Sequence, residues 1–187
     1  MAGYPSSFLG LVVDVGDWYA AIATTVPERV RVLHPEDVHV TLAFLSGVAP
    51  ECAMAAWEAA RTVALLPMTV RLARMIPMGP AEGWTALSAT IGVGSEEVAN
   101  AMLAVRDLAT DAAGARRETR APLPHVTVAR LHAKASNTHR EAARAWADAL
   151  LLDPIELRLT DIALYTGRRE RPAGQPAYQI VERATLA

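Results

Sequence analysis

A seven-residue stretch occurs twice in this chain of 187 residues, and it limits the possible folds more than any other feature. The first copy, residues 39–45, reads HVTLAFL, and the second, residues 125–131, reads HVTVARL. Five of the seven positions are identical and a sixth exchanges Leu for Val. The copies begin 86 residues apart, nearly half the chain. The repeat indicates two similar lobes that each present the same strand.

Strand geometry gives this repeat a chemical meaning. Side chains alternate between the faces of a strand, so His39 and Thr41 share one face, and His125 and Thr127 do the same. The apolar residues between them point to the other face and can pack in a core. If the two lobes face each other, two imidazoles and two hydroxyls converge on one small volume.

Such a site suits phosphate chemistry. A neutral histidine can take a proton from water while a protonated one gives a proton to a leaving oxygen, and both work near neutral pH. Threonine hydroxyls can donate hydrogen bonds to phosphoryl oxygens. The chemistry requires no metal and no cofactor. A single His-x-Thr strand usually holds only a structural histidine, whereas two copies with matching flanks favour a catalytic pair.

Composition narrows the protein class. Apolar residues make up 52% and charged residues 20%, which fits a folded domain. The formal charge of −2 argues against a general nucleic-acid coat protein, although residues 115–140 hold six basic residues and one acidic residue. That segment is either an ordinary solvated surface or a contact for RNA. No apolar run reaches the length of a membrane span, so we expect a cytoplasmic monomer that does not bind membranes.

The order of predicted elements indicates the fold class. Apolar periodicity predicts strands at 7–15, 29–33, 38–45, 68–75, 84–91, 125–131, 155–165 and 178–184, and helices at 17–26, 50–66, 95–113 and 138–151. The two element types do not alternate regularly, and several strands follow one another. This favours an α+β fold with antiparallel sheets. We find no linker, so residues 1–187 are expected to form one two-lobed domain.

These stretches resemble the 2H phosphoesterase superfamily, and within it the 2′-5′ RNA ligase-like proteins (RNA 2′,3′-cyclic phosphodiesterases). The matching residues are 35–45 (PEDVHVTLAFL), 124–130 (PHVTVAR), and Leu164-Tyr165 with the following Gly-rich loop and Ala177-Tyr178. The sequence departs from the pattern at Ser46, which separates Leu45 from Gly47, and at Thr166. The resemblance implies a bilobal fold of two pseudo-symmetric antiparallel sheets around a central cleft, with helices on the outside.

The resemblance also implies an activity, the hydrolysis of a 2′,3′-cyclic phosphate to a 2′-phosphate, on RNA ends or small nucleotides. We expect His125 to be the general base and His39 the acid that protonates the leaving 3′ oxygen. Thr41 and Thr127 are expected to hold the phosphoryl oxygens. Two alternatives stay open: a 2′-5′ RNA ligase, and a non-catalytic protein that binds RNA ends or nucleotides.

Three further residues are candidates for substrate binding. The resemblance implies that Arg130 contacts the substrate and that Phe44 lies near the base or ribose. Strand alternation alone puts Arg130 on the face opposite His125, unless a bulge or twist re-aims it. Tyr165 either stacks on a base or packs inside the protein. Asp37 either hydrogen-bonds to His39 or takes part in a metal site, and we favour no metal.

Overall fold

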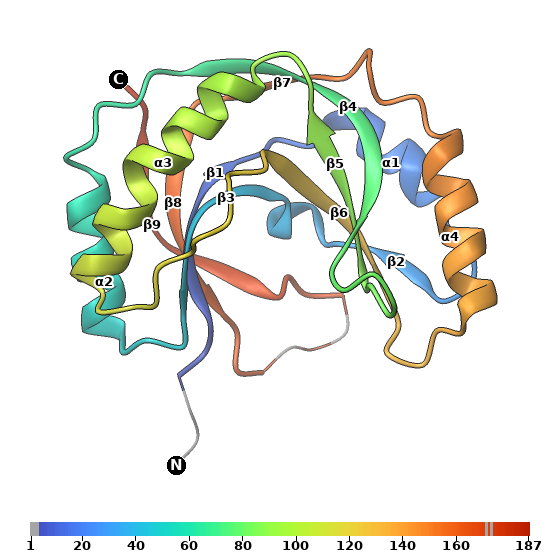
Figure 1. Cartoon of the computed structure of the whole chain (residues 1–187), viewed down its shortest axis with the longest axis horizontal. Helices are drawn as coiled ribbons and strands as arrows, with labels where there is room; N and C mark the ends of the chain where they lie inside the picture. Colours follow the sequence, from blue (N-terminus) through green and yellow to red (C-terminus); the bar gives the residue numbers. More distant parts are fainter. Residues whose placement is uncertain (1–3, 171, 173) are drawn as a thin grey trace.

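The strands of this protein form two antiparallel sheets (Figure 1). The structure is a computed structural model, and it describes residues 4–170, 172 and 174–187. The strands are β1 (Ser7–Val12), β2 (Val30–Val32), β3 (His39–Ser46), β4 (Met68–Met78), β5 (Ala86–Ile91), β6 (His125–Leu131), β7 (Glu156–Leu159), β8 (Asp161–Gly167) and β9 (Tyr178–Thr185). The helices are α1 (Gly16–Ala23), α2 (Pro50–Ala60), α3 (Ser95–Ala112) and α4 (Asn137–Ala149), with a 3₁₀ turn, η1, at Pro35–Asp37.

One sheet has the order β3-β1-β8-β9 and the other β2-β6-β5-β4-β7. Figure 1 shows α2 and α3 on the outside of the first sheet and α1 and α4 on the outside of the second. The predicted α+β architecture, with two antiparallel sheets and outer helices, is therefore confirmed. Within the described ranges, no helix is both long and apolar enough to cross a membrane.

The two copies of the repeat become β3 and β6, one in each sheet, and these strands contact each other. The lobes are not simply the first and second halves of the chain. Strand β2 from the first half pairs with β6, whereas β8 and β9 from the C-terminal part complete the sheet of β1 and β3. The chain therefore crosses between the sheets. Each strand of the repeat lies in a sheet that contains strands from both halves of the sequence.

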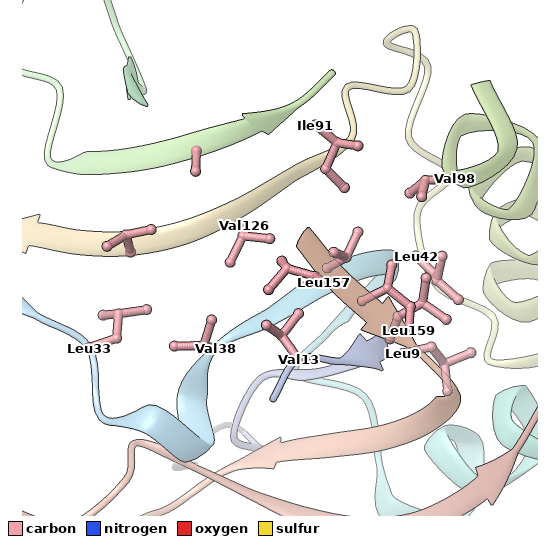
Figure 2. Close-up of a cluster of buried hydrophobic side chains, with 14 of the residues drawn as sticks. Leu9, Val13, Leu33, Val38, Leu42, Ile91, Val98, Val126, Leu157 and Leu159 are labelled. Atoms are coloured by element: carbon pink, nitrogen blue, oxygen red, sulfur yellow. The ribbon is translucent and has the colours of Figure 1, made fainter. Parts of the chain in front are cut away.

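A shared apolar core lies between the sheets (Figure 2). Leu9 and Leu42 reach it from the first sheet, and Val126 and Leu157 from the second. Each fully buried side chain of this kind stabilises the fold by about 2 kcal/mol. Because one face of β3 and of β6 is anchored in this core, the other face, with its histidines and threonines, must turn away from it.

The prediction of a single strand over residues 155–165 is wrong. Strand β7 pairs with β4 in the five-stranded sheet, and β8 pairs with β1 and β9 in the other. The residues that reach the shared core change phase at the junction, from Leu157 and Leu159 to Ile162 and Leu164, whereas Ala163 and Tyr165 are buried in a separate cluster on the other face. A single strand cannot make that change, so the chain turns at Thr160 and passes from the five-stranded sheet to the four-stranded one.

Some predicted helix ends also differ. The last helix was predicted to begin at residue 138, but it begins at Asn137, with Ser136 as the N-cap and His139 completing the capping box. Helix α2 stops at Ala60, six residues before the predicted end at residue 66. The Gly-rich loop that follows Tyr165 includes residues 171 and 173, which lie outside the described residues.

Candidate active site

The first copy of the repeat contains a β-bulge. Along the pairing of β1 with β3, Gly10 lies opposite Thr41 while its neighbour Leu9 lies opposite Ala43. Leu42 is therefore an extra residue with no partner on β1. An extra residue of this kind reverses the alternation of side chains beyond it.

The second copy contains the same bulge at the same position. Along the pairing of β5 with β6, Ser88 lies opposite Thr127 while Leu87 lies opposite Ala129. Val128 is the extra residue here. The two copies of the repeat therefore share their backbone geometry as well as their sequence.

The bulge decides where the sixth residue of each copy points. In both strands the first and third residues are partly exposed, the second, fourth, fifth and seventh are buried, and the sixth is exposed. The sixth residues are Phe44, which is 53% exposed, and Arg130. Strict alternation would have turned Arg130 away from His125. The structure instead puts Arg130 with His125 on the face that is not buried in the core.

His39 is held by two hydrogen bonds. Its Nδ1 lies 2.7 Å from the carbonyl oxygen of Asp37, and because a carbonyl can only accept, Nδ1 carries the proton. Its Nε2 lies 3.1 Å from the hydroxyl of Thr41. In the neutral ring Nε2 is therefore an unprotonated nitrogen that can accept a proton.

Three aromatic rings surround His39. Phe8 stacks on its imidazole with ring centroids 4.3 Å apart, Tyr165 lies at 5.2 Å, and Tyr178 stands edge-on at 6.0 Å. Burial lowers the pKa of His39 from 6.5 to about 4, because the charged imidazolium loses its hydration. The positive charges of His125 and Arg130 also lower this pKa, while Asp37 raises it. Both basic groups of the second copy thus lie within electrostatic reach of His39.

His125 repeats the local geometry in a more open setting. Its Nδ1 lies 2.6 Å from the carbonyl oxygen of Leu123, again two residues before the histidine. Among the described residues, no ring stacks on His125 and its Nε2 has no hydrogen-bond partner. The hydroxyl of Thr127 lies 3.1 Å from that of Ser88, which is fully buried.

Gly10 and Ser88 occupy matching positions opposite the two threonines. They differ in what they leave for the threonine: Thr127 bonds to the hydroxyl of Ser88, whereas Thr41, opposite Gly10, bonds to His39. A Cβ atom at Gly10 would lie 3.0 Å from the carbonyl oxygen of Val40 and 3.4 Å from Cδ2 of His39. A Cβ at this position would crowd the Val40 carbonyl and touch the His39 ring, so glycine lets the backbone next to His39 lie close to β1. Neither residue belongs to the repeat, so the sequence did not indicate a role for them. Only the register of the strands shows that they lie opposite the threonines.

Of the two interpretations of Asp37, the structure shows the hydrogen bond to His39, and it is made by the backbone carbonyl of Asp37 rather than by its carboxylate. The Asp37 carboxylate, which is 1% exposed, accepts the backbone N–H groups of Ala177 and Tyr178 at 2.8 and 2.9 Å. His39 uses the Asp37 carbonyl instead. Asp37 thereby ties η1 to the start of β9, where Tyr178 flanks His39. Within the described parts of the chain, no three His, Cys, Asp or Glu side chains gather as a metal site would need.

Tyr165 packs under the rings of Phe8 and His39 and is buried. It is 1% exposed and stacks on Phe8 with centroids 4.8 Å apart. Burial raises the pKa of its phenol far above the ordinary value. A ring with so little exposed surface offers no face on which a base can stack. Of the two interpretations of Tyr165, the structure therefore favours packing, and its contacts are with His39 and the aromatic rings beside it.

Two of the six basic residues in the segment 115–140 form ion pairs within the protein. Arg117 pairs with Asp111, and Arg120 pairs with Glu118. Arg140 donates to the backbone carbonyl oxygen of Ala135 and so belongs to the start of α4. Arg130 is the member of this segment that lies on the same strand as His125.

Comparisons with known proteins identify the fold. The sequence matches no protein-family model and no curated protein. Among solved structures, it is similar to a phosphoesterase (19% identity, 98% of each chain, TM-score 0.69) and to Escherichia coli LigT complexed with 3′-AMP (19% identity, 97% of this chain and 98% of LigT, TM-score 0.66). Usb1 of Kluyveromyces marxianus is also similar (12% identity, 98% of each chain, TM-score 0.61). The chain has the fold of these proteins along essentially its whole length.

Proposed function

We propose that this chain is a 2H phosphoesterase that hydrolyses a 2′,3′-cyclic phosphate to a 2′-phosphate. One observation carries the proposal. His39 and His125 occupy the same position on two contacting strands, and each donates its Nδ1–H to the carbonyl two residues earlier. Both rings are thus held in the tautomer that leaves Nε2 for proton transfer, with Arg130 nearby for the phosphate. LigT, which has the same fold, has been crystallised with 3′-AMP and with phosphate.

From the sequence we expected His125 to be the base and His39 the acid. The different surroundings of the two histidines favour the reverse. With a pKa of about 4, His39 is neutral at pH 7 and is suited to be the general base. Its Nε2 takes a proton from water as the water oxygen attacks phosphorus. His125, the more open of the two, then acts as the acid and donates a proton from Nε2 to the 3′ oxygen as the P–O3′ bond breaks. The products are a 2′-phosphate and a 3′-hydroxyl.

The remaining residues suit the two parts of such a substrate. Thr127 and Arg130 are donors for the phosphoryl oxygens, whose negative charge grows in the transition state. The hydroxyl of Thr41 donates to Nε2 of His39 in the free protein and becomes a donor for the phosphate once that nitrogen takes a proton from water. Phe44, at the position equivalent to Arg130, offers an exposed ring to the base or ribose.

The test is product analysis with adenosine 2′,3′-cyclic phosphate in the presence of EDTA. We expect adenosine 2′-phosphate from the wild type and losses of about 10²–10⁴-fold in kcat for His39→Ala and for His125→Ala. His132→Ala is the matched control, because His132 is exposed at the end of the second copy. Activity that persists in either site variant would rule out the paired mechanism.

The same assay separates the two alternatives. An added oligonucleotide with a 5′-hydroxyl end would be joined by a 2′-5′ ligase, and the product would be longer than either substrate. A non-catalytic binding protein would bind the cyclic nucleotide without converting it.

A further inference from the structure

A second arginine lies beside Arg130 on the neighbouring strand. In the antiparallel pairing of β2 with β6, Arg31 is directly opposite Arg130. Residues directly opposite each other point to the same face of a sheet, with Cβ atoms about 4.5–5.5 Å apart. Both arginines are exposed, while Val30 on the same strand is buried. Arg31 therefore extends the face that carries His125 and Arg130 outward, toward the β2 edge.

This pair of arginines is electrostatically unfavourable by itself. Like charges directly opposite on a sheet destabilise it. Among the described residues, neither Arg31 nor Arg130 has an acidic partner, whereas Arg117 and Arg120 each pair with a carboxylate. Two unpaired guanidinium groups side by side favour the binding of an anion, because an anion removes their repulsion.

The cyclic phosphate does not need both arginines. It carries a single negative charge, and its non-bridging oxygens already have Arg130 and the hydroxyls of Thr41 and Thr127 as donors. Arg31 lies on the far side of Arg130 from β5, since β6 runs between β2 and β5. The anion it can bind is therefore a second phosphate, displaced from the reacting one toward β2.

We propose that Arg31 binds the phosphodiester that links the terminal nucleotide to the one before it, so that the site prefers an oligonucleotide end to a free cyclic nucleotide. This inference rests on the proposed function, which it extends from the reacting group to the substrate class. A mononucleotide with a 2′,3′-cyclic phosphate lacks this second phosphate and leaves Arg31 without a partner.

The test compares adenosine 2′,3′-cyclic phosphate with the dinucleotide ApA that ends in a 2′,3′-cyclic phosphate. For Arg31→Gln we expect the ratio of kcat/KM, dinucleotide over mononucleotide, to fall about tenfold. The kcat/KM for the dinucleotide should also become less sensitive to salt than in the wild type, because one attraction between a cation and a phosphate is lost. Arg158→Gln is the matched control, because Arg158 is an exposed arginine on β7, at the other edge of the same sheet.

Two results would overturn the proposal. In the first, Arg31→Gln lowers kcat/KM equally for both substrates, and Arg31 then acts on the cyclic phosphate itself. In the second, the ratio does not change. A separate binding measurement keeps this test independent of turnover. In the His39→Ala background, Arg31→Gln should weaken binding of the dinucleotide about tenfold more than binding of the mononucleotide, whether or not the wild type hydrolyses them.

Discussion

The imidazole of His39 stacks on the phenyl ring of Phe8, with centroids 4.3 Å apart and ring planes inclined by 27°. His125 occupies the same position in the other copy of the repeat and has no such contact among the described residues. Two identical sequence positions therefore hold chemically different histidines. The difference comes from β1 and β8, which lay Phe8 and Tyr165 against only one of them.

The pH dependence of catalysis should reveal this difference. If His39 is the base, kcat/KM needs its neutral form, which persists as the pH falls until about pH 4. We expect the acidic limb of the bell-shaped kcat/KM profile near pH 4, well below the ordinary histidine pKa of 6.5. In Phe8→Leu the limb should move upward, because the imidazolium is better hydrated. A kcat/KM that instead falls as the pH rises above 4 would make His39 the acid.

Gly10→Ala should damage the site more than the fold. The new Cβ would lie 3.0 Å from the carbonyl oxygen of Val40, so the backbone next to His39 must shift by a few tenths of an ångström and move the His39 ring with it. A shift of this kind disturbs proton transfer, and we expect kcat to fall about 10²-fold. Gly92→Ala is the control, since its Cβ would be equally crowded, 3.3 Å from that of Ala73, but outside the repeat strands. Equal activity in the two variants, measured with the cyclic nucleotide, would contradict the role assigned to Gly10.

Ser88→Ala tests whether the buried hydroxyl orients Thr127. Without its partner at 3.1 Å, the Thr127 hydroxyl can rotate away from the phosphate. We expect kcat to fall about 5-fold with little change in KM, an amount that corresponds to one neutral hydrogen bond. Ser7→Ala removes a comparable buried hydroxyl, which bonds to Thr166 at 3.2 Å, and should leave kcat as in the wild type. A kcat that falls equally in both variants would point to a general loss of structure.

Asp37→Asn should destabilise the protein. An amide oxygen can still accept one of the two backbone N–H groups, but the amide nitrogen then faces the other, and a buried donor is left unpaired. We expect the free energy of unfolding, measured in urea, to fall by about 1–3 kcal/mol. Glu36→Gln, an exposed change in the same turn, should cost under about 0.5 kcal/mol. Equal stability of the two variants would contradict the bridging role of Asp37.

Local patterns in the sequence determined a large part of this structure. The repeat predicted two equivalent strands, and alternation predicted that His39 and Thr41 share a face, because side-chain direction within a regular strand depends only on residue spacing. The α+β class followed from the order of elements in the same way. The change of phase between Leu159 and Ile162 was also visible in the sequence, and it marks the break between β7 and β8.

Contacts between distant segments decided the rest. The bulges at Leu42 and Val128 exist only relative to β1 and β5, and they turn Phe44 and Arg130 to the site face. The partners Gly10, Ser88 and Arg31 come from strands whose register no local pattern specifies, because packing of the shared core sets it. The low pKa of His39 has the same origin: the sequence supplies two identical histidines, and only the folded protein packs aromatic rings against one of them.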